Sequence, residues 1–286
     1  MRVVFDTNVL SNESFDLLEA SQMRVLVRRG QTKPVYGHVL IEETMRTYGS
    51  DRRRADLVAR RLPFLADTAT LICNDFLEIW HSELVQGRGI HARIFMEAKE
   101  RDRLIAAWRN VPADGSWRAW NESAAARQEE YRKRDAQRQT SRGIRDEMVA
   151  WKRKVDYDPY KHGFTDFQRY IAENLVYAGK LFIRALVGSK DPQELAIRWS
   201  RSPAAYPFFT TFVKNMLYIA HHAATRSDAI DLNAQADLDL MTHLLHSDIL
   251  VSNETRFMRT AFEDLWRPRK KVLFTASEFA SFLATL

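Results

Sequence analysis

The stretch VVFDTNVL, residues 3–10, begins with three apolar, β-favouring residues that are followed directly by an acid. Such a run predicts a buried strand over residues 3–5 that places Asp6 at its carboxyl end. Ligands of open α/β sheets bind at that end of the strands, so Asp6 is a candidate site residue that Thr7 and Asn8 can orient by hydrogen bonding. The alternative is that Asp6 caps the turn or helix that follows it.

The next elements continue an alternation of helix and strand. Residues 14–29 read as a helix, and residues 34–36 read as a short strand. A further helix is predicted over residues 38–48, and it carries Glu42 and Glu43 on neighbouring faces. Taken alone, these two glutamates are better explained as solvated carboxylates near a helix N-terminus.

The end of the chain repeats this order of elements. A helix is predicted over residues 236–246, a strand over residues 249–252 and a last strand over residues 272–274. Strands that alternate with helices are typical of an α/β fold with a mostly parallel central sheet.

Acids also recur in this second half. Asp237 and Asp239 open the predicted helix, where acids are ordinary, and two residues apart they cannot both face one site. Asn253 and Glu254 follow their strand as Asp6 follows the first one. This repetition is harder to explain by solubility alone.

The middle of the chain has a different character. Between residues 74 and 202 strand-like runs are few, so this part is predicted to be mainly helical. Helices are predicted at residues 167–187 and, just after this part, at residues 207–224. Residues 117–154 are rich in Arg and Lys, and tryptophans are interleaved with basic residues there and just before. Such a segment could stack bases and contact phosphates, although packing and solvation explain these residue types more often. The tryptophans are Trp108, Trp117, Trp120 and Trp151.

The net charge, the number of cysteines and the lack of long apolar runs limit the functional classes to which the protein can belong. The 286 residues carry a net charge of +6, which favours acidic partners such as nucleic acid. Cys73 is the only cysteine, so an intramolecular disulfide and a Cys-rich zinc site are excluded. No signal peptide and no apolar run of about 20 residues is evident, so we expect a soluble, cytoplasmic protein without a membrane partner. The histidines that a transition metal could use are better explained as partly buried packing residues: His221, His222, His243 and His246.

Together these segments resemble the PIN-domain nuclease family. The resemblance rests on VVFDTNVL, on YGHVLIEETMR at residues 36–46, on ADLDLMTHLLHSDILVSNETRF at residues 236–257 and on the ending KKVLFTASEFASFL. It covers residues 1–72 and 205–286, and the joint order of motifs is more specific than any single one.

The resemblance implies a three-layer α/β/α fold with a mostly parallel sheet and a large all-helical insertion. The chain would divide into an N-terminal half at residues 1–73, the insertion at residues 74–204 and a C-terminal half at residues 205–286.

The resemblance also implies a metal site for Mg²⁺ or Mn²⁺, because hard oxygen ligands select these ions. Its ligands and catalytic acids would be Asp6, Glu43, Asp237 and Glu254. Asn8, Ser252 and Asn253 would support them, with Glu42 and Asp239 as reserve acids. The family's fourth position is commonly Asp, and this chain has Glu254 in its place.

The expected activity is hydrolysis of phosphodiester bonds by a metal-activated water, with RNA as the first substrate and DNA as the second. The sequence is also compatible with an oligomer or with a protein partner. The alternative is a catalytically silent scaffold that binds nucleic acid or a protein through the helical insertion.

Overall fold

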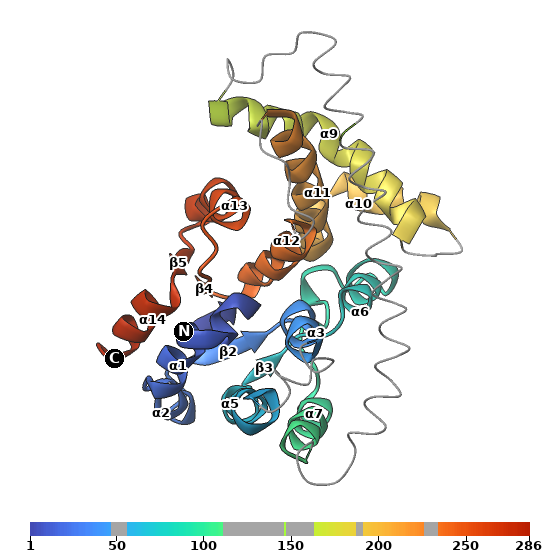
Figure 1. Cartoon of the computed structure of the whole chain (residues 1–286). Helices are drawn as coiled ribbons and strands as arrows, with labels where there is room; N and C mark the ends of the chain where they lie inside the picture. The colour runs from blue at the N-terminus through green and yellow to red at the C-terminus, as the bar shows by residue number, and fades with distance from the viewer. Residues whose placement is uncertain (47–55, 111–145, 147–162, 187–190, 226–233) are drawn as a thin grey trace.

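The computed structural model describes residues 1–46, 56–110, 146, 163–186, 191–225 and 234–286 (Figure 1). Its centre is a sheet of five strands in the order β3-β2-β1-β4-β5, and every neighbouring pair is parallel. The prediction of an α/β fold with a parallel sheet is therefore confirmed. The strands are β1 (Arg2–Phe5), β2 (Lys33–Tyr36), β3 (Leu71–Ile72), β4 (Ile249–Val251) and β5 (Val272–Phe274).

Strand β1 lies in the middle of the sheet and joins the two ends of the chain. Val4 is in register with Val35 of β2 on one side and with Leu250 of β4 on the other. Its last three residues are buried, which is what an apolar run without alternation predicts for a central parallel strand. Whatever follows β1 and β4 therefore emerges side by side at the carboxyl edge.

Helices lie on both faces of this sheet. In Figure 1, α1 (Asn12–Ala20), α2 (Met23–Arg28) and α5 (Leu62–Thr68) lie below it, and α12 (Ala234–Thr242) and α13 (Phe257–Leu265) lie above it. The other α-helices are α3 (His38–Arg46), α6 (Phe76–Trp80), α7 (Ala98–Asn110), α9 (Gly163–Leu186), α10 (Pro192–Arg201), α11 (Pro207–Thr225) and α14 (Ala276–Leu283). Short 3₁₀ or π turns are η1 (Thr7–Leu10), η3 (Leu57–Arg61), η4 (His81–Val85), η5 (Gly89–His91), η7 (Pro203–Ala205), η8 (His243–His246) and η9 (Arg267–Arg269).

Two predicted helices are interrupted. The helix expected over residues 14–29 is two helices, because Ser21 takes an extended conformation and its hydroxyl donates a hydrogen bond to the Leu18 carbonyl at 2.6 Å. The helix expected over residues 236–246 ends in the tighter turn η8. Strand β3 has only two residues and was not predicted from the sequence, since so short a run carries no period.

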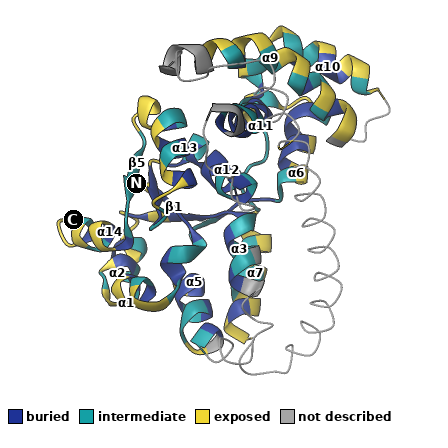
Figure 2. Cartoon of the chain, turned by 45° about the horizontal axis from the view of Figure 1, so that its top comes forward, coloured by how far each residue is buried: buried dark blue, intermediate teal, exposed yellow. Residues whose placement is uncertain are grey.

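Between β3 and β4 the described residues form helices and one isolated antiparallel bridge, Cys73 to Phe95. Figure 2 shows that α9 and α10 expose their outer faces, whereas α11 is largely buried. Helix α10 packs closely on α9, since a Cβ added to Gly179 would lie 2.0 Å from the indole of Trp199.

A buried carboxylate connects these helices to the rest of the chain. Glu83 in η4 accepts hydrogen bonds from the backbone N–H groups of Phe208 and Phe209, at 2.9 and 2.7 Å. These groups belong to the first turn of α11, which has no partner for them within the helix. Glu83 thus caps α11 from another part of the chain.

Candidate functional site

Asp6 is held at the carboxyl end of β1 by three side chains. Its side chain is buried, and its Oδ2 accepts hydrogen bonds from Asn8 Nδ2 at 2.6 Å and from Ser252 Oγ at 2.7 Å. Its Oδ1 lies 3.3 Å from the hydroxyl of Thr7. Asp6 is the N-cap residue of the turn η1 that follows it, without a side-chain cap hydrogen bond of regular geometry.

Thr7 connects Asp6 to a second acid. Its hydroxyl donates a short hydrogen bond to Oε2 of Glu43, which is half-buried on α3. Residues 36 positions apart are thus joined because β1 and β2 are neighbours and α3 follows β2 directly. The expected partnership of Asp6 and Glu43 is present as an Asp6–Thr7–Glu43 contact.

Burial raises the pKa of Asp6 above its usual range, and the charge of Glu43 raises it further. The hydrogen bonds from Ser252, Asn8 and Thr7 oppose this effect. No ion pair with Lys, Arg or His reaches Asp6 or Glu43 within the described residues. Two close carboxylates without a protein cation are the arrangement that a bound cation stabilises.

The residues after β4 reach the same edge. Ser252 is buried, and besides donating to Asp6 its hydroxyl accepts the N–H of Glu254 at 3.0 Å. The carboxylate of Glu254 turns back on its own chain, where Oε1 accepts the N–H groups of Thr255 and Arg256 at 3.1 and 2.9 Å. Glu254 therefore has a local capping role in addition to the ligand role expected of it.

Asn253 ties several elements together rather than facing the acids. Its amide nitrogen donates to Ser14 at 2.8 Å, and its amide oxygen accepts the N–H of Ala276 at the start of α14 at 3.0 Å. Its backbone N–H donates to Asn8 at 3.1 Å. The support that Asn253 gives to the site is thus indirect, through Asn8.

The expected third acid lies on a neighbouring helix. Asp237 is half-buried in the first turn of α12, and α12 packs against α3, the helix of Glu43. Asp239 is also half-buried on α12. Glu42 lies within α3, but its side chain is outside the described residues.

The four expected acids are not gathered into one metal-binding group. Among the residues that the structure describes, no three His, Cys, Asp or Glu side chains are placed to hold a metal ion. Asp6 and Glu43 are joined through Thr7, and Glu254 is joined to Asp6 only through Ser252, by its backbone N–H. The donor set of this pair still suits Mg²⁺ or Mn²⁺, since it consists of carboxylate oxygens.

The histidines and the described tryptophan behave as packing residues. His243 is buried and stacks on Phe76 with ring centroids 5.4 Å apart, and neither of its nitrogens has a hydrogen-bond partner in the described part of the chain. Its pKa is lowered to about 3, mainly by burial. Trp108 is also buried, and Trp117, Trp120 and Trp151 lie outside the described residues.

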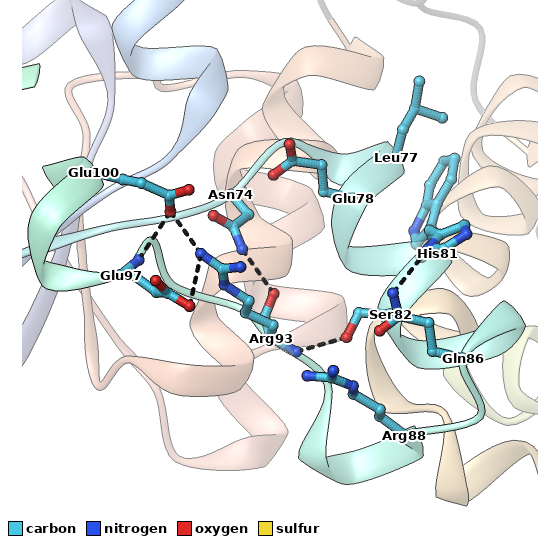
Figure 3. A pocket seen from close by; sticks show the side chains of 11 residues that line it. Asn74, Leu77, Glu78, His81, Ser82, Gln86, Arg88, Arg93, Glu97 and Glu100 are labelled. Atoms are coloured by element: carbon cyan, nitrogen blue, oxygen red, sulfur yellow. Dashed lines mark hydrogen bonds and ion pairs between the residues drawn. The ribbon is translucent and has the colours of Figure 1, made fainter.

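A second feature was not evident from the sequence. An open cavity of about 640 Å³ lies beyond the carboxyl end of β3, between α6 and the start of α7 (Figure 3). Its lining comes from three stretches within residues 74–100, where polar and charged residues read individually as ordinary surface. Only the fold brings them around one space.

Comparison with known proteins adds no relative: no protein-family model, no curated protein and no solved structure matches the chain. No helix in the described ranges is long and apolar enough to cross a membrane.

Proposed function

We propose that this chain is a metal-dependent nuclease of PIN-like type that hydrolyses phosphodiester bonds, with RNA as the first substrate to test. The observation that carries the proposal is the Asp6–Thr7–Glu43 contact at the carboxyl edge of a parallel sheet, with Ser252 donating to the same aspartate. That edge is where open α/β sheets bind ligands.

Asp6 and Glu43 would hold the ion, and Asp237 and Glu254 would complete its surroundings directly or through water. A divalent ion bound here supplies an activated water and neutralises charge on the phosphoryl oxygens. Asn8 and Ser252 keep the Asp6 carboxylate oriented, as partners of metal ligands generally do. In such a hydrolysis the water oxygen would bond to phosphorus as the bond to the leaving oxygen breaks in line, and the proton that the water loses would reach the leaving oxygen through solvent.

The net charge of +6 supports a polyanionic substrate. Nothing in the geometry of Asp6 and Glu43 selects ribose over deoxyribose. RNA stands first because of the resemblance of VVFDTNVL and its companion segments to the PIN family, and single-stranded DNA is the second substrate.

One observation favours a second candidate function, a catalytically silent scaffold. The described residues lack a group of three metal-binding side chains, and Glu254 is engaged with its own backbone. A scaffold of this kind would bind nucleic acid without cutting it.

The two functions are separated by incubating the purified chain with a mixed pool of RNA and single-stranded DNA, with Mn²⁺, with Mg²⁺ and with EDTA. A nuclease cuts only with metal, and the Asp6→Asn and Glu43→Gln variants lose this activity by about 100-fold or more, as loss of a metal ligand implies. Glu173→Gln, on the exposed face of α9, is the matched control and keeps full activity. Binding of the pool without cleavage under any metal condition would favour the scaffold.

A further inference from the structure

The cavity beyond β3 has a surplus of negative charge. Three glutamates line it, Glu78, Glu97 and Glu100, against two arginines, Arg88 and Arg93. The guanidinium of Arg93 forms ion pairs with two carboxylates, since its Nη2 lies 2.6 Å from Oε2 of Glu100 and 3.5 Å from Oε1 of Glu97. Within the described part of the chain, Glu78 forms no ion pair. This acidic cavity is unusual in a chain with a net charge of +6.

One hydrogen-bond acceptor without a partner among the described residues belongs to a side chain that lines the cavity. Asn74 is only 4% exposed, and its amide nitrogen donates to the Arg93 carbonyl at 3.1 Å. Its amide oxygen has no hydrogen-bond partner among the described residues. This oxygen is not one of the fully buried polar atoms, so it is open to a hydrogen bond from water or from a ligand that donates one.

The opposite wall is aromatic and apolar. Trp80 is 7% exposed, lines the cavity, and its indole N–H has no partner among the described residues. His81 and the 59% exposed Leu77 continue this wall, and Ile90, 65% exposed, lies in the turn between the two arginines. Flat rings beside carboxylates attract planar cations.

We propose that this cavity binds an arginine side chain of a partner polypeptide. A guanidinium presents five donors in one plane, which matches the two carboxylates around Arg93 and the free oxygen of Asn74, while its face stacks on the wall of Trp80. The proposal is independent of the nuclease function.

Size and charge favour a peptide segment over a lone cation or a phosphate. A volume of about 640 Å³ exceeds what one side chain fills and suits an arginine together with its neighbouring residues. The exposed Leu77, which lines the cavity, then meets an apolar partner residue. Arg88 has no side-chain partner among the described residues and can donate to partner carbonyl oxygens. A phosphate would meet the surplus of negative charge that three glutamates leave over two arginines, which disfavours nucleic acid in this cavity.

The test is an NMR titration of the full chain that follows the indole N–H signal of Trp80, assigned with the Trp80→Phe variant. The probe is the capped tetrapeptide acetyl-Gly-Leu-Arg-Gly-amide, and its matched control carries citrulline, which is isosteric and uncharged, in place of arginine. Spermidine and AMP are titrated as a small cation and an anion.

We expect the arginine peptide to shift the Trp80 signal, the citrulline peptide to leave it unchanged, and Glu97→Gln to weaken binding about fivefold. Glu173→Gln, an exposed acid on α9, leaves the affinity unchanged. The proposal is overturned if the arginine peptide causes no shift, if citrulline binds equally well, or if spermidine or AMP binds as tightly as the arginine peptide.

Discussion

The cap that Glu83 places on α11 makes the stability of the protein depend on pH in a defined direction. Glu83 is 0% exposed, and burial raises its pKa from 4.5 to about 7, although the N–H groups of Phe209 and Phe208 act in the opposite sense. An acid whose pKa is higher in the folded protein than in the unfolded chain binds its proton more tightly when folded. Its contribution to stability is therefore complete below pH 4.5 and is lost as the pH rises toward 7.

The perturbation that isolates this effect is Glu83→Gln. Glutamine keeps the shape of the side chain and one carbonyl acceptor for α11, but it does not ionise. Each pKa unit corresponds to 1.36 kcal/mol, so between pH 5 and pH 8 the wild type should lose about 2 to 3 kcal/mol relative to the variant. At pH 5 the variant should be less stable by about 1 kcal/mol, because one N–H loses its acceptor.

Urea unfolding followed by tryptophan fluorescence measures this difference, with both proteins studied at pH 5 and pH 8. Every other titrating group is shared by the two proteins and cancels in the comparison. Glu173→Gln on α9 serves as the exposed control, and its difference from the wild type should not change with pH. If Glu83→Gln keeps a constant difference from the wild type, within about 0.5 kcal/mol, the cap does not ionise in this range and the reasoning fails.

Three further outcomes are expected. Gly37→Ala should lower the free energy of unfolding, measured in urea, by about 1–3 kcal/mol, because its Cβ would lie 2.5 Å from Nε2 of the buried His243. If this clash is the cause, the same substitution should cost less in a chain that also carries His243→Ala. Because the pKa of His243 is lowered in the folded protein, the wild type loses stability as the pH falls below 6.5. When the pH is lowered from 7.5 to 5, the free energy of unfolding of His243→Leu should therefore rise by about 2 kcal/mol relative to that of the wild type. A difference that does not change with pH would contradict this. Ser252→Ala, which removes a donor to Asp6, should weaken Mn²⁺ binding about 10-fold or more by calorimetry, and unchanged affinity would show that Ser252 does not orient a metal ligand.

Much of the sheet could be predicted from local pattern. The run at residues 3–5 is apolar without alternation, and it became the central strand because a parallel strand that is buried on both faces needs such a run. The strand over residues 272–274 was also placed correctly. Strand β3 was missed because two residues have no detectable period, and Ser21 broke a helix whose apolar spacing continues across it.

The candidate site was only partly predictable. Asp6 and Glu43 follow neighbouring strands, so parallel topology alone brings them near each other. Asp237 and Glu254 lie at the expected places in the chain, but their side-chain directions depend on α12 and on the turn after β4. The cap of α11 by Glu83 left no trace in the sequence, since its two partners lie 125 and 126 residues away.

The sequence by itself therefore determined the class of fold and the two ends of the chain that meet, because burial and hydrogen bonding impose their periods on consecutive residues. It also determined that an acid follows the central strand. Only the tertiary structure decided which acids touch, that Thr7 joins Asp6 to Glu43, and that an acidic cavity opens beyond β3. The physical reason is that these contacts join residues distant in the chain, and their geometry depends on how whole elements pack.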